Sequence, residues 1–191
     1  MDILIIDNGT HHLVKIKELL SESAITIRPY FSDKIESLPF FDLFILTGGS
    51  AHPVVGNEKL FSNELRLIKT INKPIIGICL GFELIAKAFG AKLQKLVMKE
   101  RGIITIDWLD HRSNIFKDSF DRPIKVYESH KWIIQTLSKS LIGLAKSKDG
   151  YEVIKHKTKP IYGFQFHPEL FVDKTYGNEI FERVFKKISQ K

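Results

Sequence analysis

The segment from Pro74 to Phe89 restricts the fold more than any other part of the chain. A short apolar run ends at Ile76, and an apolar pattern with a period near that of a helix begins at Leu80. Such an abrupt change of period predicts a buried strand, a sharp turn and a helix. Gly77 and Gly81 flank this turn, where small residues let a strand and a helix approach each other closely.

Cys79, the only cysteine, stands at the centre of this turn. The pattern Gly77-Ile-Cys-Leu-Gly81 has the form of a nucleophile elbow, in which a strained backbone presents the central side chain. We therefore expect Cys79 to project toward solvent and to meet the positive end of the helix dipole, which lowers the pKa of a thiol. A lone cysteine is more often an inert buried residue, but the glycines and the strand-to-helix change favour a nucleophile here.

The remaining sequence up to Gly90 alternates strands and helices, which predicts an α/β fold with a parallel sheet and helices on both faces. After Gly90, short strands joined by polar turns predict an antiparallel hairpin region, so the sheet is expected to be mixed but mostly parallel. The expected strands are 3–7, 24–28, 43–46, a short strand that ends at Ile76, 91–96, 103–108, 124–127, 141–145, 151–155 and 161–166. The expected helices are 13–20, 32–38, 57–68, 80–89 and a last helix from Thr175.

Composition limits the classes of protein to which the chain can belong. Its 191 residues are expected to form one domain, 1–191, and 43% hydrophobic with 27% charged residues is typical of a soluble globular protein. We expect no membrane association, because no apolar run approaches the roughly 18 residues of a membrane span. The net charge of +7 comes from scattered lysines, so we expect no nucleic-acid partner. A single cysteine and the absence of a secretory signal favour a cytoplasmic location.

A cysteine nucleophile needs a base and a group that orients the base. His167 and Glu169 follow directly after the predicted strand 161–166, at the end of a strand where active sites of open sheets collect. We predict that His167 is the base and that Glu169 orients it. Four other histidines are expected to be ordinary surface residues, namely His11, His12, His111 and His156. No metal and no cofactor is expected, because the histidines and the single cysteine lack the spacing of a ligand set.

The third requirement of such a site is a pair of backbone donors for the developing oxyanion. The amide of Leu80, directly after the nucleophile, is one candidate. The second is the loop that contains Gly48 and Gly49, because glycine permits close backbone approach at the end of the strand 43–46. Gly48-Gly49 alone would be weak evidence, since it also suits a plain connection.

These motifs together resemble the class I, or triad, glutamine amidotransferases. The resemblance rests on the elbow around Cys79 and on Gly163-Phe-Gln-Phe-His-Pro-Glu169, which lie about ninety residues apart as in that family. It extends along the chain through Ile5-Ile-Asp-Asn-Gly9, Thr47-Gly48-Gly49 and Leu84-Ile-Ala-Lys-Ala-Phe-Gly90. The resemblance implies a three-layer, flavodoxin-like fold and a Cys79-His167-Glu169 triad.

Glu128-Ser129-His130 is similar to a segment of the separate amidotransferase subunit of archaeal-type GMP synthetases. In the family this segment helps to hold glutamine, largely through backbone groups, which implies substrate binding by Ser129 and His130. Glu83 stands where the family usually has a substrate-contacting glutamine, and it adds a negative charge to that position. Other departures are Ser50 to Pro53 after the glycine loop, Thr10 after Asn8-Gly9, and Trp132 in place of an acidic residue.

The resemblance implies that glutamine is the substrate and that Cys79 attacks its side-chain amide. Ammonia would pass to a separate synthetase subunit, an ATP-pyrophosphatase, most simply for the synthesis of GMP from XMP. Three alternatives remain open from the sequence. They are a stand-alone gamma-glutamyl amide hydrolase, the amidotransferase subunit of another synthetase, and a non-enzymatic binding module.

Overall fold

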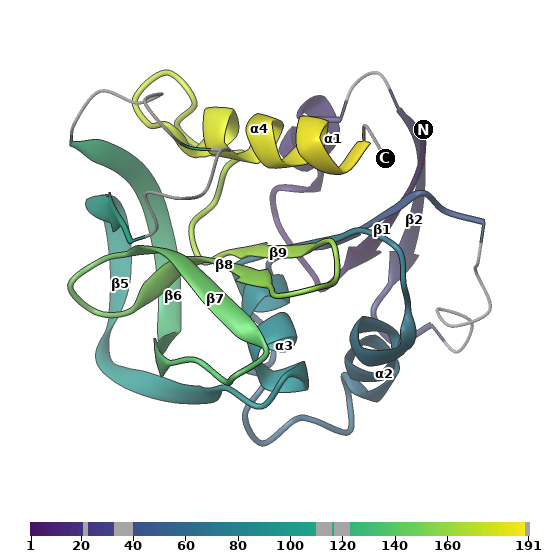
Figure 1. Ribbon diagram of the computed structural model, residues 1–191, viewed down its shortest axis with the longest axis horizontal. Helices are drawn as coiled ribbons and strands as arrows, with labels where there is room; N and C mark the ends of the chain where they lie inside the picture. Colours follow the sequence, from purple (N-terminus) through teal and green to yellow (C-terminus); the bar gives the residue numbers. More distant parts are fainter. Residues whose placement is uncertain (21–22, 33–39, 110–115, 117–122, 190–191) are drawn as a thin grey trace.

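The computed structural model describes residues 1–20, 23–32, 40–109, 116 and 123–189. Figure 1 shows a central sheet between two helical layers. One layer holds α1 (Leu13–Glu18) and α4 (Gly177–Ser189), and the other holds α2 (Ser62–Thr70) and α3 (Leu80–Ala88). This arrangement is the three-layer α/β fold that the sequence predicts.

Five neighbouring strands form the parallel half of the sheet, in the order β2-β1-β3-β4-β9. Their short apolar runs are covered by helices on both faces, as expected for parallel strands. The strands are β1 (Asp2–Asp7), β2 (Ala24–Pro29), β3 (Leu43–Leu46), β4 (Ile75–Ile78) and β9 (Ile161–Phe164).

The other half of the sheet is antiparallel and continues the order as β9-β8-β7-β5-β6. β8 (Tyr151–His156) and β7 (Leu141–Lys146) extend the sheet beyond β9. β5 (Lys92–Trp108) and β6 (Ile124–Thr136) form a long antiparallel pair that curls away from the layers, as Figure 1 shows.

The core consists of two apolar clusters, one on each face of the sheet. In β1, Ile3 and Ile5 belong to the cluster beneath α1 and α4, whereas Leu4 and Ile6 belong to the cluster beneath α2 and α3. All four side chains are fully buried. The period of two along the strand thus divides one apolar run between two helical layers.

The fold class is confirmed, but several boundaries differ from the prediction. The predicted strands 91–96 and 103–108 are one strand, β5, whose pairing with β6 resumes at Glu100 after a register shift between Lys95 and Glu100. β6 extends to Thr136, well beyond the predicted end at Tyr127. The helix predicted from Asn57 begins at Ser62. The helix predicted at 32–38 lies almost entirely outside the described residues.

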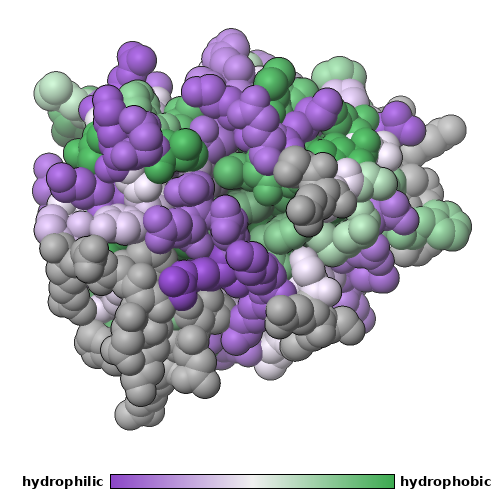
Figure 2. All heavy atoms as spheres, turned by 90° about the horizontal axis from the view of Figure 1, so that it is seen from above, coloured by the Kyte–Doolittle hydropathy of each residue, from purple (hydrophilic) through white to green (hydrophobic). Residues whose placement is uncertain are grey.

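Figure 2 shows the molecule from above, on the side of α1 and α4 in Figure 1. Hydrophilic side chains cover much of this face, and hydrophobic side chains are visible between them. α4 itself buries Ile180, Phe181 and Val184 against the sheet and turns charged residues outward. Among the described helices, none has both the length and the apolar character that a membrane crossing requires.

Candidate active site

The turn between β4 and α3 has the strained conformation predicted for an elbow. Cys79 has φ +50° and ψ −102°, a region that residues with a side chain rarely adopt. Its amide donates a hydrogen bond to the carbonyl of Phe164 in β9 (2.8 Å), and its carbonyl accepts one from Glu83 (3.1 Å). These bonds tie the strained residue to the neighbouring strand and to the helix.

Gly77 and Gly81 are required by the close approach of β3, β4 and α3. A Cβ atom at Gly77 would lie 2.5 Å from the carbonyl group of Gly81. A Cβ atom at Gly81 would overlap the carbonyl oxygen of Leu46 in β3. Both contacts involve backbone atoms that cannot rotate away, so the small residues are a geometric condition of the elbow.

A cavity of about 980 Å³ brings together Cys79, His167 and Glu169. His167 and Glu169 follow β9, which pairs with β4 through Ile78 and Phe164, so both turns lie at the same edge of the sheet. The Nδ1 atom of His167 lies 2.8 Å from Oε1 of Glu169, and both side chains are buried. The structure thus places a thiol and a hydrogen-bonded histidine–carboxylate pair in one cavity.

The glycine loop after β3 lies against this pair of turns. A Cβ atom at Gly48 would be 3.3 Å from Cε1 of His167 and 3.4 Å from Cβ of Cys79, so the loop backbone approaches both side chains. Gly49 lines the cavity. The backbone of Leu80 forms a hydrogen bond with the Cys79 thiol group. These positions are compatible with the predicted oxyanion donors, whose role remains a prediction.

The predicted environment of the Cys79 thiol is wrong in two respects. Cys79 is only 6% exposed, so it lies at the base of the cavity rather than projecting into solvent. Burial raises the pKa of the thiol well above its usual value, and the charges of Glu83, Glu128 and Glu169 raise it further. The bond from the Leu80 backbone lowers the pKa, but burial outweighs it. Attack by this thiol therefore requires a base that takes its proton.

The three predicted substrate-binding residues do not lie together. Ser129 lines the cavity. His130, its neighbour in β6, is 3% exposed and lies on the opposite face of the strand, because successive side chains alternate. Glu83 is also 3% exposed and is not among the residues that line the cavity, although its charge acts on Cys79.

The cavity is also lined by residues that were not expected at the site, including two histidines that were expected to be ordinary surface residues. His11 and His12 line the cavity, and the ring of His12 lies 6.0 Å from that of His167 in an edge-on arrangement. Burial lowers the pKa of His12. Lys99 and Arg101 from β5 also line the cavity. Both histidines follow the turn Asn8-Gly9-Thr10 at the end of a parallel strand, and this position could have indicated that they lie in the cavity.

Comparison with known proteins identifies the family. The family model for glutamine amidotransferase class-I matches residues 4–188. The chain belongs to the class I glutamine amidotransferases. It is similar to the glutamine-hydrolysing subunit of GMP synthase from Methanocaldococcus jannaschii, with 33% identity over 96% of both chains. The same-named subunit of Pyrococcus abyssi is 35% identical over 88% of this chain and 89% of its own length.

Solved structures agree with this assignment. A candidate GMP synthase subunit from Thermoplasma acidophilum superposes with a TM-score of 0.83 and 29% identity, over 100% of this chain and 98% of that one. A glutamine amidotransferase from Thermotoga maritima has the same fold, with a TM-score of 0.81 over 100% of this chain and 99% of that one, at 16% identity.

Glu83 stands where the resemblance to the family implies a glutamine, and the effect of its carboxyl group on Cys79 can be tested. Burial raises the pKa of Glu83 to about 8, so the side chain is mostly neutral at pH 7 and becomes charged above pH 8. The charge then disfavours the Cys79 thiolate. We expect Glu83→Gln to increase the rate of thiol alkylation by iodoacetamide roughly three- to tenfold at pH 9 and little at pH 6.5. We also expect glutamine turnover to improve at pH 9. An equal effect at both pH values would contradict the electrostatic explanation.

A second buried glutamate supports the glycine loop of the amidotransferase. Asn8 donates hydrogen bonds from Nδ2 to the carbonyl of Thr47 (3.0 Å) and to Oε1 of Glu64 (3.2 Å). The amide of Asn8 donates to Oγ1 of Thr47 (2.9 Å). Glu64 is fully buried. This network fixes the start of the loop that continues into Gly48 and Gly49.

Glu64 should make the stability of the fold depend on pH. Burial raises its pKa to about 8 from an ordinary value of 4.5, so the folded chain holds a proton that the unfolded chain releases. Its contribution is fully present below pH 4.5 and is lost as the pH rises toward 8, by a few kcal/mol in total. We expect Glu64→Gln to raise the melting temperature by about 5–10 °C more at pH 8.5 than at pH 5. Replacing the exposed Glu18 by glutamine is the control, and an equal shift at both pH values would contradict the prediction.

Proposed function

We propose that the chain hydrolyses glutamine to glutamate and ammonia through Cys79, His167 and Glu169. His167 takes the proton of the Cys79 thiol as the sulfur attacks the side-chain amide carbon, and then donates it to the leaving ammonia. Glu169 orients His167 and stabilises its charged form. The observation that carries the proposal is the meeting of Cys79 with the hydrogen-bonded His167–Glu169 pair in one cavity.

The first half of the reaction forms a tetrahedral oxyanion, and the second half resolves a covalent intermediate. The amide of Leu80 and the Gly48-Gly49 loop stabilise the oxyanion, a role in which one donor contributes about 10²- to 10³-fold in rate. Loss of ammonia leaves a glutamyl thioester on Cys79. Water, activated by His167, then attacks the thioester carbonyl, releases glutamate and restores the thiol.

We further propose that the ammonia passes to a separate synthetase subunit that converts XMP to GMP. The support for this acceptor is the similarity to relatives named as the glutamine-hydrolysing subunit of GMP synthase. Free ammonia would be protonated in water at neutral pH and would lose its nucleophilicity, so the synthetase must dock at the cavity. A cytoplasmic location belongs to the same proposal, because the thiol must remain reduced.

Glutamine-dependent amination tests this function directly. The purified chain is mixed with an archaeal-type ATP-pyrophosphatase subunit, XMP, ATP and Mg²⁺, with either glutamine or an ammonium salt as the nitrogen source. We expect GMP to form from glutamine only when the chain is present, and from the ammonium salt without it. Ammonia release from glutamine without GMP formation would retain the glutaminase and reject this acceptor.

Glu83 motivates a second candidate, a stand-alone hydrolase of gamma-glutamyl amides on the same fold. The elbow helix carries a buried carboxyl group at Glu83, where the resemblance to the family implies a glutamine amide. Steady-state kinetics on glutamine and on gamma-glutamyl peptides separate the two functions. Rapid cleavage of the peptides but not of glutamine, without any effect of a synthetase, would favour this candidate.

A further inference from the structure

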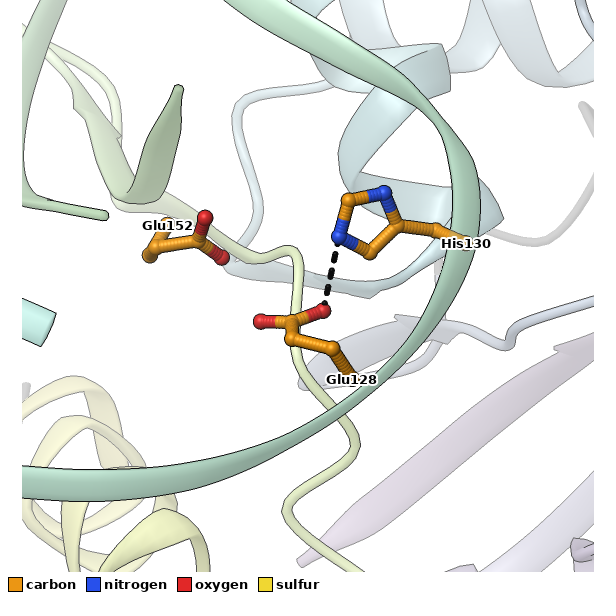
Figure 3. A group of neighbouring side chains, drawn as sticks. All are labelled: Glu128, His130 and Glu152. Carbon is orange, nitrogen blue, oxygen red and sulfur yellow. Dashed lines mark ion pairs between the residues drawn. The ribbon is translucent and has the colours of Figure 1, made fainter. Parts of the chain in front are cut away.

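A buried cluster of polar side chains lies between β6 and β8, outside the cavity of the proposed active site. Along β6, Ile124, Val126, Glu128 and His130 alternate with more exposed residues and face the interior. Glu152 enters the same space from β8. Figure 3 shows the carboxyl groups of Glu128 and Glu152 and the ring of His130 directed toward a common space. This strand face therefore changes from apolar to strongly polar along its length.

The ligand-type atoms of this cluster are close together. One atom each from Glu128, His130 and Glu152 all lie within 4.8 Å of one another. Nε2 of His130 lies 3.0 Å from Oε2 of Glu128 and 3.4 Å from Oε2 of Glu100 on β5. Ser147 donates a hydrogen bond to Oε1 of Glu152 (2.7 Å), which fixes that carboxylate from outside the cluster.

These atoms are buried, and the described residues do not satisfy them by hydrogen bonds. Glu128, His130 and Glu152 are exposed by 0%, 3% and 1%. Besides the contacts of Nε2 of His130 with Glu128 and Glu100, the oxygens of Glu128, Nδ1 of His130 and Oε2 of Glu152 have no well-formed hydrogen bond in the described part of the chain. Leaving such groups unpaired in the interior is unfavourable, and more so when they are charged. A cluster with three carboxyl groups, including Glu100, and one imidazole lacks positive charge.

We propose that Glu128, His130 and Glu152 bind a divalent first-row transition metal ion such as Zn²⁺, with Glu100 as a further ligand. An imidazole nitrogen in the set favours such an ion over Mg²⁺ or Ca²⁺, which prefer oxygen ligands only. Metal bonds of about 2.0–2.2 Å place ligand atoms on the order of 3–4 Å apart, so small side-chain rotations close the set around an ion. Ser147 is the outer partner that holds a ligating carboxylate in place.

No metal site was expected from the sequence, because the histidines and the single cysteine lack the spacing of a ligand set along the chain. This set instead combines two residues of β6 with one of β8, and two of its three members are carboxyl groups. The competing explanation is a pair of carboxyl groups that shares a proton, because burial raises the pKa of Glu128 to about 8 and raises that of Glu152 as well. The proposal does not depend on the catalytic role of Cys79.

Metal content distinguishes the two explanations. The full chain with Cys79→Ser, which removes the one thiol that could bind zinc, is stripped with a chelator, equilibrated with Zn²⁺ at pH 7.5 and freed of excess metal. We expect one zinc per chain by elemental analysis and a rise in melting temperature with zinc concentration. Cobalt should give the visible spectrum of an ion bound by nitrogen and oxygen ligands.

Variants locate the ion within the molecule. The double variant Glu128→Gln, Glu152→Gln keeps the side-chain shapes and should lower zinc affinity at least a hundredfold by titration calorimetry. The matched control is Glu64→Gln, which removes an equally buried carboxyl group outside the cluster and should bind zinc like the parent chain. Less than about 0.1 zinc per folded parent chain would overturn the proposal. Equal zinc affinity in the double variant and the control would also overturn it, because the ion would then lie elsewhere, for instance at the cavity histidines.

Discussion

Cys79→Ala is expected to lower glutamine hydrolysis at least about 10⁴-fold at pH 7.5. In the proposed covalent mechanism, loss of the nucleophile leaves only the proposed oxyanion donors and substrate binding, which supply a small part of the acceleration. The measurement is ammonia release from saturating glutamine, with the synthetase subunit present. Mass spectrometry of the native enzyme during turnover should show a glutamyl adduct on Cys79 that is absent from the variant.

The controls for this variant concern its fold and its partner. Cys79 is almost fully buried, and alanine removes only the sulfur, so we expect the circular dichroism spectrum and melting curve to remain cooperative. Amination of XMP from an ammonium salt in the complex should be unchanged, because it bypasses the cavity. Residual glutaminase activity above about a tenth of the native rate would reject Cys79 as the nucleophile.

Glu169→Gln is expected to lower kcat for glutamine about 10²- to 10⁴-fold with little change in KM. The carboxylate lies 2.8 Å from Nδ1 of His167, where it fixes the tautomer that leaves the other ring nitrogen free to take a proton. Glutamine keeps the shape of the side chain, but it loses the charge and can present its NH₂ group to the ring instead. The imidazolium that forms during attack is then unsupported.

Thiol reactivity separates this catalytic effect from structural damage. The charge of Glu169 also raises the pKa of Cys79, so Glu169→Gln should leave alkylation by iodoacetamide at pH 9 unchanged or faster while hydrolysis falls. Slower alkylation together with slower hydrolysis would instead indicate a distorted elbow. Glu182→Gln, which alters an exposed glutamate on α4, is the matched control and should change neither rate.

The elbow and the triad candidates could be predicted from the sequence because their signals are local. The apolar period changes at one point, the glycines stand at fixed offsets from Cys79, and Pro168 sets the turn between His167 and Glu169. The structure adds the register of β4 with β9, which brings the two turns to one cavity. The length of β5 and β6 was not predictable in this way, because the two strands resume pairing after a register shift between Lys95 and Glu100, which no local apolar pattern indicates.

The electrostatics of the site were not predictable from local sequence. A cysteine at a helix N-terminus suggests a thiol with a lowered pKa, but burial reverses the direction, with smaller contributions from Glu83 in the same helix and from Glu128 and Glu169 in distant segments. The same limit applies to His12, whose approach to His167 depends on how β1 and β9 are ordered in the sheet.

By itself, the sequence determined the fold class, the glycine-flanked turn at Cys79, the histidine–glutamate pair and the family, because each is marked by short motifs or apolar periods that are visible along the chain. Only the tertiary structure decided how far Cys79 is buried, which face of β6 carries His130, and that Glu152 joins Glu128 and His130. Burial, strand register and long-range charge depend on contacts between residues that are far apart in sequence. The amino-acid sequence does not directly show which of these residues are close in space.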